Sequence, residues 1–176
     1  MRLLIVIMCF GLLVVFLYAC RSSSSVSTLE VVPRVELDRY LGTWYEISRY
    51  PNKFQKEDCV GTTATYALRE DGKISVDNRC RKGSPDGPES MANGKAWVVD
   101  PETNARLKVQ FFWPFSGDYW IIQLGDQYEY AVVGHPDRKY LWILSRTPRM
   151  DPEMYARVLA RLKQQGYDLE QLIVAE

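Results

Sequence analysis

From residue 43 onward, apolar and polar side chains alternate in short runs along the chain. A period of two is typical of half-buried β-strands, because successive side chains of a strand face opposite sides of the sheet. The runs are separated by short links such as 69–73 (REDGK) and 84–88 (SPDGP), in which Gly, Asp and Pro favour tight turns. The pattern predicts eight strands, at Thr43–Tyr50, Thr62–Leu68, Lys73–Arg79, Gly94–Val99, Arg106–Phe112, Tyr119–Leu124, Tyr128–Gly134 and Tyr140–Ser145.

After residue 150 the apolar positions change to helical spacing. Asp151 is placed to cap the helix, Pro152 suits its first turn, and Gly166 follows its end. One apolar face indicates that the helix packs on the outside of the sheet, before a short last strand at about 172–174. Eight short strands suit an antiparallel sandwich or barrel, and the late helix with its closing strand favours an all-β, up-and-down barrel. The apolar residues of the helix are Met154, Tyr155, Val158, Leu159 and Leu162.

The N-terminal segment has the plan of a secretory signal. Arg2 precedes an almost wholly apolar run, Leu3–Leu17, and Ala19 supplies the small residue of a cleavage site. The alternative is an uncleaved anchor helix. The stretch LYAC resembles the bacterial lipobox, in which Cys20 becomes the first mature residue and carries acyl chains such as palmitate. We therefore predict a signal peptide over 1–19, a lipidated Cys20 with a serine-rich tether over 20–32, and a barrel domain over 33–176.

Composition excludes several classes of function. The chain has 22 Lys and Arg residues and 22 Asp and Glu residues, so no basic surface for nucleic acid is expected. Its one histidine, His135, lies in a predicted turn, which leaves no histidine cluster for a metal and no partner for a nucleophile. Phosphate-binding and dinucleotide motifs are absent from the sequence. We expect no metal, no cofactor and no enzymatic activity, whereas 12% aromatic residues indicate a large apolar interior or a ligand pocket.

Two cysteines fall within the predicted barrel and flank its second hairpin. Export permits a disulfide between Cys59 and Cys80. A simple register that pairs Leu68 with Ile74 places Cys80 opposite Thr62, about 10 Å along the strand from Cys59. A disulfide needs α-carbons within about 7 Å, so it requires a bulge or a bend at Cys59. The alternative is a free thiol.

Two short motifs resemble those of the lipocalin family. Residues 42–45 (GTWY) are similar to the first lipocalin motif, and residues 144–148 (LSRTP) to the third, while Asp126 and Tyr130 loosely resemble the second. With the lipobox, the chain looks most like the bacterial outer-membrane lipoprotein lipocalins, over about residues 35 to 173. The resemblance implies a closed barrel that holds a hydrophobic ligand.

The resemblance also implies where particular side chains lie. Gly42 and Trp44 belong to the structural motif, with Trp44 across the closed end of the barrel and Arg146 over its ring. Glu46 would lie inside as the partner of a buried donor, or, as an alternative, take part in proton-linked ligand release. Among polar inward groups, Asn78 and Gln123 could orient a ligand head. The predicted ligand-binding residues are Ser48, Tyr50, Ala64, Tyr66, Val76, Asn78, Ala96, Val98, Val109, Phe111, Tyr119, Ile121, Val133, Tyr140 and Trp142.

The sequence thus predicts a membrane-anchored lipocalin that binds, stores or transports a fatty acid or lysophospholipid. A barrel filled by its own side chains, an enzyme that acts on a bound lipid through Cys59 or Glu46, and an envelope interaction module are the alternatives. In the last, the rim segments 51–58 and 111–117 would form the working surface, or 111–117 would pack as a lid over the mouth. Arg21 after Cys20 implies retention at the outer membrane, facing the periplasm. Both a monomer and a homodimer are open, and no nucleic-acid partner is expected.

Overall fold

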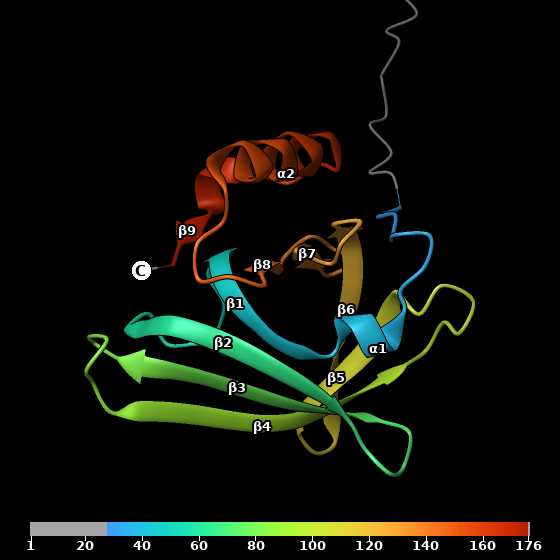
Figure 1. Cartoon of the computed structure of the whole chain (residues 1–176), viewed down its shortest axis with the longest axis horizontal. Coiled ribbons are helices and arrows are strands. Elements are labelled where there is room, and N and C mark those ends of the chain that lie inside the picture. The colour runs from blue at the N-terminus through green and yellow to red at the C-terminus, as the bar shows by residue number, and fades with distance from the viewer. Residues whose placement is uncertain (1–27, 176) are drawn as a thin grey trace, which may run out of the picture.

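The computed structural model describes residues 28–175, and Figure 1 shows a barrel with one long helix outside it. Strand β1 opens the barrel after a single helical turn, α1. The bounds are α1 (Leu37–Tyr40), β1 (Gly42–Arg49), β2 (Cys59–Leu68), β3 (Ile74–Lys82), β4 (Glu89–Val98), β5 (Arg106–Phe112), β6 (Phe115–Leu124), β7 (Tyr130–Gly134), β8 (Leu141–Ser145), α2 (Pro152–Gln164), the 3₁₀ turn η1 (Leu169–Gln171) and β9 (Ile173–Val174).

The eight long strands close into an antiparallel barrel, as predicted. Each strand from β2 to β7 pairs with the next in the chain, β8 pairs with β1, and β1 pairs with β2 to complete the circle. Because alternate links of such a barrel lie at the same end, the links β1–β2, β3–β4, β5–β6 and β7–β8 surround one end. We call this end the mouth; α1 and the remaining links lie at the other, closed end.

Three strands begin earlier than the sequence pattern predicted. In the hairpin of β3 and β4, pairing continues through Cys80 with Ser90 and Arg81 with Glu89, where both strands carry polar residues. β2 begins at Cys59 rather than Thr62, and β6 begins at Phe115 rather than Tyr119. The added residues of β4 and β6 are mostly exposed on both faces, and those of β2 include Gly61, so no alternation marks these extensions in the sequence.

Helix α2 has the ends that the sequence predicted. The Asp151 carboxylate accepts a hydrogen bond from the Met154 N–H at 2.9 Å, and Pro152 occupies the first helical position. Val158 and Leu162 are buried against Ile143 on the outer face of the barrel, and Figure 1 shows the helix over β7 and β8. The predicted closing strand is β9, which pairs with the end of β1.

Two apolar clusters stabilise the domain, one inside the barrel and one between the barrel and α2. Both clusters are built wholly from residues 29–172. A domain with a complete core of its own is expected to fold without the preceding segment.

The packed domain starts before residue 33, which was the predicted start of the barrel domain. Leu29 is only 2% exposed, and the Val32 N–H donates to the Ile121 carbonyl at 3.0 Å. An apolar side chain at Leu29 gains more by packing beneath α2 than a flexible tether would allow. The predicted signal peptide and Cys20 lie outside the described residues.

Candidate ligand-binding site

Trp44 and Arg146 close one end of the barrel, as the motif resemblance implied. Trp44 is fully buried, and the Arg146 guanidinium carbon lies 3.7 Å from the centre of its ring. Arg146 also donates to the backbone carbonyls of Thr43 at 3.0 Å and Arg39 at 2.6 Å. Gly42 has a φ of +91°, and a side chain there would approach Arg146 Nη1 at 3.4 Å. The first and third motifs therefore form one structural plug.

Three tyrosine hydroxyls meet above this plug. The Tyr119 hydroxyl lies 2.7 Å from that of Tyr40 and 3.0 Å from that of Tyr66. Burial raises the pKa of Tyr66 to about 12 and the pKa values of Tyr40 and Tyr119 as well, so all three stay neutral donors. Tyr40 lies on α1, outside the alternating pattern, and for that reason the sequence did not indicate it.

Most of the predicted ligand-binding residues face the interior. Tyr66, Val76, Ala96, Ile121 and Val133 belong to the buried cluster inside the barrel. Asn78 is paired directly with Ala64, so it shares that inward face. Tyr140 lies just before β8, with its ring 6.2 Å from that of Trp142. That these inward residues bind a ligand stays a prediction. The partly buried members packed against the same cluster are Ala64, Val98, Val109, Phe111, Tyr119 and Trp142.

Part of the inner wall of the barrel remains accessible. Inward residues such as Val109, Phe111 and Trp142 remain partly exposed although strands flank them on both sides. The Asn78 Oδ1 atom is buried and has no hydrogen-bond partner among the described residues. Exposed apolar surface beside an unused acceptor is the lining expected of a site for an apolar molecule with a polar head.

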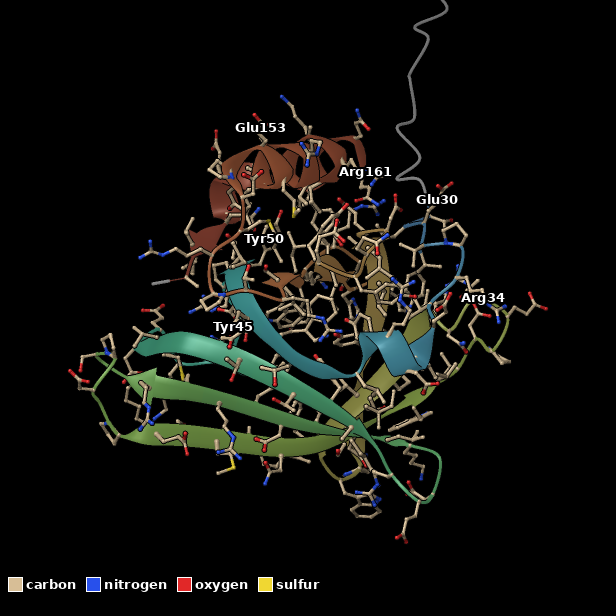
Figure 2. All side chains as sticks on the ribbon, in the orientation of Figure 1. Glu30, Arg34, Tyr45, Tyr50, Glu153 and Arg161 are labelled. Carbon is tan, nitrogen blue, oxygen red and sulfur yellow. A yellow bond between two sulfur atoms is a disulfide. The ribbon has the colours of Figure 1, made fainter. Side chains whose placement is uncertain are left out.

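Ser48 and Tyr50 were predicted to face the interior, and this placement is wrong. The register of β1 against β8 shifts between Glu46 and Ser48, and a β-bulge reverses the side-chain alternation beyond it. The Ser48 hydroxyl lies 2.7 Å from the Tyr155 hydroxyl of α2. Tyr50 donates to the Asp168 carbonyl at 2.7 Å, and Figure 2 shows it between the end of β1 and the C-terminal elements.

A second bulge turns Gln123 away from the interior. The register of β6 against β7 shifts between Ile121 and Gln123. The Gln123 amide then donates to Gln165 Oε1 at 2.9 Å, at the end of α2. Gln123 therefore links the barrel to the helix, contrary to its predicted inward position.

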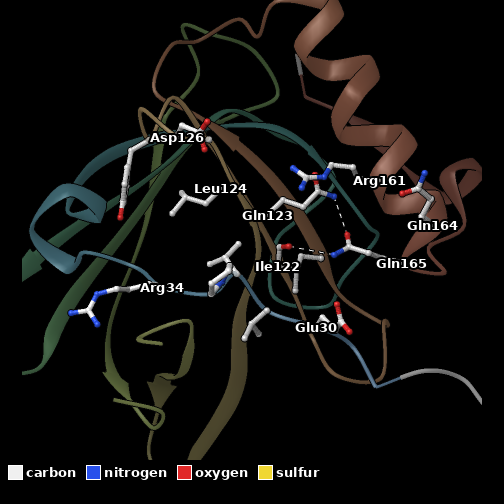
Figure 3. Close-up of a pocket in the computed structure, with 14 residues that line it drawn as sticks. Glu30, Arg34, Ile122, Gln123, Leu124, Asp126, Arg161, Gln164 and Gln165 are labelled. Atoms are coloured by element: carbon white, nitrogen blue, oxygen red, sulfur yellow. Dashed lines mark hydrogen bonds between the residues drawn. The ribbon is translucent and has the colours of Figure 1, made fainter. Parts of the chain in front are cut away.

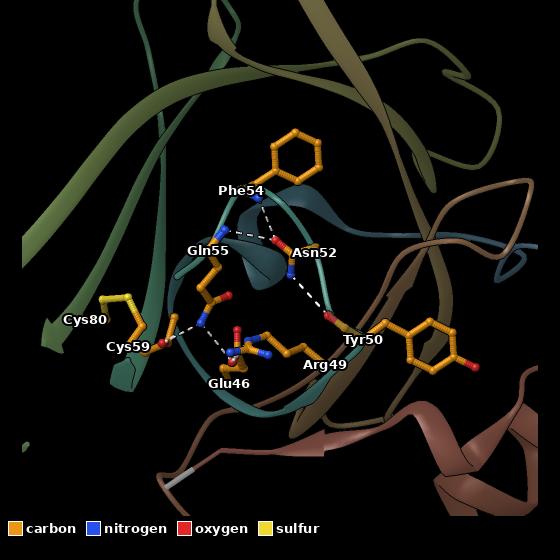
Figure 4. Close-up of polar contacts among 9 residues, drawn as sticks. Glu46, Arg49, Tyr50, Asn52, Phe54, Gln55, Cys59 and Cys80 are labelled. Carbon is orange, nitrogen blue, oxygen red and sulfur yellow. Dashed lines mark hydrogen bonds and ion pairs between the residues drawn. A yellow bond between two sulfur atoms is a disulfide. The ribbon is translucent and has the colours of Figure 1, made fainter. Parts of the chain in front are cut away.

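The bulge in β1 places Arg49 inside instead. Arg49 is paired directly with the inward Trp142, and Arg49 Nε lies 3.2 Å from Glu46 Oε1. Gln55, from the β1–β2 loop, donates to the same carboxylate oxygen at 3.1 Å (Figure 4). Burial raises the pKa of Glu46, opposed by Gln55 and Arg49. The predicted pairing of Glu46 with a buried donor is confirmed, and Arg49 is the site residue that the sequence did not reveal.

The predicted disulfide joins Cys59 and Cys80, whose α-carbons lie 5.4 Å apart. The register passes from Val60 opposite Arg81 to Thr63 opposite Arg79, which leaves two residues opposite Cys80. One of them is Gly61, with a φ of +57°. The bulge that the sequence required is therefore present, and Cys59 has no free thiol.

A hollow of about 560 Å³ lies outside the barrel, between residues 30–34, the end of β6 and the C-terminal half of α2 (Figure 3). Glu30, Arg34, Asp126 and Arg161 line it. An open groove bounded by charged side chains does not suit an apolar ligand, so the barrel interior is the better candidate for one.

Aromatic side chains are exposed at the tip of the β5–β6 hairpin. Phe112 is 77% exposed, Trp113 86% and Phe115 77%. On the β1–β2 loop, Phe54 is 65% exposed, and its ring lies 5.3 Å from that of Tyr140. The alternative in which 111–117 packs as a lid is therefore wrong for the tip itself.

Within residues 28–175, no group of three or more His, Cys, Asp or Glu side chains is arranged to hold a metal ion. In the same range, every helix is too short or too polar to cross a membrane.

Comparison with known proteins places the chain in a family. The sequence profile described as "Lipocalin-like domain" matches residues 35–176. The chain is 43% identical over 157 residues to the outer membrane lipoprotein Blc of Escherichia coli (strain K12), covering 88% of this chain and 86% of that protein. It is 39% identical over 152 residues to temperature-induced lipocalin-1 of Arabidopsis thaliana, covering 82% and 80%.

A solved structure shows the same fold. The structure of insecticyanin from the tobacco hornworm Manduca sexta superposes with a TM-score of 0.67 at 21% identity, over 84% of each chain. Together, the closed barrel, the plug of Trp44 and Arg146, and the matches over most of the chain show that this protein belongs to the lipocalin family.

Proposed function

We propose that the protein binds a single-chain lipid, a fatty acid or a lysophospholipid, inside its barrel. The observation that carries this proposal is the interior itself. Its closed end is sealed by Trp44, its walls are apolar, and inward side chains such as Val109 and Trp142 keep exposed surface. An eight-stranded barrel encloses room for one small ligand, and a long, thin acyl chain fits that shape.

The comparisons support a place in the cell envelope. Blc of E. coli and of Vibrio cholerae are named as outer membrane lipoproteins, and the present chain carries a lipobox-like stretch that ends at Cys20. We infer that Cys20 is lipidated and holds the domain at the outer membrane, on the periplasmic side. The domain would then store or transport its lipid beside a membrane.

A binding function accounts for the site better than catalysis does. The disulfide occupies the Cys59 sulfur, which removes the nucleophile of the enzymatic alternative. The Glu46 carboxylate is engaged by Arg49 and Gln55. The family consists in general of binding proteins, in keeping with this proposal.

Native mass spectrometry of residues 28–176, purified from the source organism without detergent, tests the proposal. We expect a co-purifying mass that extracts into organic solvent and is lost in Trp142→Ala. Val109→Phe, which fills the same interior, should also exclude it. Urea unfolding checks that both variants fold. An apo mass, with no uptake of offered oleate or oleoyl lysophospholipid, would contradict lipid binding.

The exposed aromatic tip favours a second candidate function, contact with a lipid bilayer. Phe112, Trp113 and Phe115 project from a hairpin whose residues 109–117 carry no charge. Trp and Phe side chains partition readily into the membrane interface. We expect residues 28–176 to sediment with phospholipid vesicles and Trp113→Ser to bind them less. Leu68→Ser, at an exposed position of the closed end, is the control; an equal effect of both would exclude the tip as the contact.

A further inference from the structure

Strands β1 and β2 stop pairing about halfway along the barrel. They pair only from Gly42 to Tyr45, after which β1 pairs with β9 at Ser48 and Arg49. Gln55 spans the opening, because its amide donates both to Glu46 on β1 and, at 2.9 Å, to Thr62 on β2. A hollow of about 330 Å³ lies here, and its lining includes Arg49, Pro51, Lys53, Gln55, Glu57 and Ile173.

Arg49 reaches this hollow with most of its hydrogen-bonding capacity unused. A guanidinium carries five N–H donors in a rigid fork. The Arg49 side chain is only 6% exposed, yet its one polar contact is the ion pair with Glu46. Its Nε atom makes no hydrogen bond of acceptable geometry, and no described residue accepts from either Nη atom. A buried cation with unmet donors is costly unless something else accepts from it.

The polar groups around Arg49 indicate which kind of ligand could accept its hydrogen bonds. Asn52 Oδ1 already accepts from the Phe54 and Gln55 N–H groups, and the Gln55 amide is used by Glu46 and Thr62. The donors that remain in the lining are the Arg49 fork and the Lys53 ammonium, faced by the exposed Glu57 carboxylate. Two cations, one of them a buried fork, match a carboxylate or a phosphate.

We propose that this hollow is the subsite for the anionic head of the bound lipid, with Arg49 as its principal ligand and Lys53 as its second cation. The proposal rests on the proposed lipid-binding function and adds a preference for an oxyanion head. Because Arg49 is paired with the inward Trp142, it belongs both to the inner wall and to the hollow. An acyl chain in the barrel and its head at Arg49 therefore fit one amphiphile. Glu46 competes with that head for the guanidinium.

The test compares three ligands with the same oleoyl chain on residues 28–176, which contain both apolar cores: oleate, oleoyl lysophosphatidylglycerol and the uncharged monoolein. Dissociation constants are measured by titration calorimetry at pH 7.5 in a buffer free of phosphate. Arg49→Gln should weaken binding of the anionic ligands about tenfold or more and leave monoolein within about twofold. Glu46→Gln should act oppositely and tighten the anionic ligands several-fold, because the competing carboxylate is gone. Lys139→Gln, at an exposed rim cation, is the matched control.

The possible results of this titration test the oxyanion subsite and the lipid-binding function separately. Weakening of both anionic ligands by Arg49→Gln supports an oxyanion subsite; weakening of only one identifies carboxylate or phosphate as the head. Equal weakening of monoolein would show that Arg49 is structural and overturn the inference. The double variant with Glu46→Gln and Arg49→Gln, which leaves no buried charge unpaired, excludes misfolding as the cause if it too loses the preference. Failure of all three ligands to bind the unmodified domain would overturn the proposed function itself.

Discussion

At the scale of single residues, Arg146 shows how one side chain closes the barrel. Its guanidinium covers the Trp44 ring and also donates to the Tyr128 and Tyr40 carbonyls, besides those of Thr43 and Arg39. These carbonyls come from segments far apart in the chain, so the side chain joins α1, β1 and the β6–β7 turn. A methionine there could cover the ring but could not donate.

We expect Arg146→Met to lower the free energy of unfolding by about 2–4 kcal/mol, from the lost cation–π contact and charged hydrogen bonds. Urea unfolding measures it. The control is Arg157→Met on the exposed face of α2, where the ion pair spans 4.0 Å and the expected change is below about 0.5 kcal/mol. Similar values for the two variants would mean that the plug is not a stabilising element.

Glu46 predicts a pH dependence of stability. Burial raises its folded pKa above the ordinary 4.5, so the folded state holds the proton more tightly than the unfolded state. This contribution to stability is complete below pH 4.5 and is lost as the pH rises through the raised pKa. The free energy of unfolding of the unmodified domain, relative to Glu46→Gln, should therefore fall with rising pH in that window. Urea unfolding of both proteins from pH 4 to 8 measures it, and a constant difference would contradict the raised pKa.

At the scale of elements, the sequence predicts strands well and bulges poorly. Alternation located all eight strands, and Asp151, Pro152 and Gly166 marked the ends of α2. Alternation alone continues Trp44 inward to Ser48 and Tyr50. Packing against α2 interrupts this alternation. Ile47 and Ser48 both pack toward α2, so β1 contains one extra residue and the Arg49 side chain turns inside. That competition between two faces leaves no local mark in the sequence.

The bulge in β2 was one of the two ways in which the predicted disulfide could form, the other being a bend at Cys59. Cys59 and Cys80 could not meet in a simple register, and Gly61 supplies the positive φ at which the strand gains a residue. The disulfide closes a loop with a sequence separation of 21 residues. In the chain-entropy account, a loop of this length is worth about 3 kcal/mol.

Cys59→Ala with Cys80→Ala should therefore lower the free energy of unfolding by about 3 kcal/mol. Reduction of the unmodified domain should bring it to a similar stability, while the double variant should not respond to the reductant. Urea curves with and without dithiothreitol measure both. A double variant as stable as the oxidised domain would show that the bond does not constrain the unfolded chain.

At the scale of the whole molecule, the resemblance to the lipocalin motifs predicted the closed end, and the predicted export made a disulfide between Cys59 and Cys80 possible, which the structure contains. The mouth was harder to predict from the sequence. Arg49, Gln55 and the opening between β1 and β2 depend on where β9 returns and how the mouth loop folds back. Tyr40 and Leu29 lie outside any strand, so no period identified them as core residues.

The burial of Leu29 shortens the predicted tether between Cys20 and the folded domain. If Leu29 belongs to the cooperative unit, the predicted tether after Cys20 has eight residues, 21–28, rather than the twelve of 21–32. Fully extended, eight residues span about 28 Å, against about 42 Å for twelve, so the barrel would be held nearer the membrane.

Leu29→Ala should lower the free energy of unfolding by about 2–4 kcal/mol, because it leaves a cavity between the N-terminal segment and α2. Leu68→Ala is the matched control, since that leucine is 59% exposed and its truncation should cost less than about 0.5 kcal/mol. Urea unfolding and amide hydrogen exchange at Val32 measure the effect together. If the two leucine variants are equally stable and Val32 exchanges freely in both, residues 28–32 belong to the tether after all. If only Leu29→Ala is destabilised, residues 29–32 belong to the folded domain, and the predicted tether after Cys20 is the shorter one, 21–28.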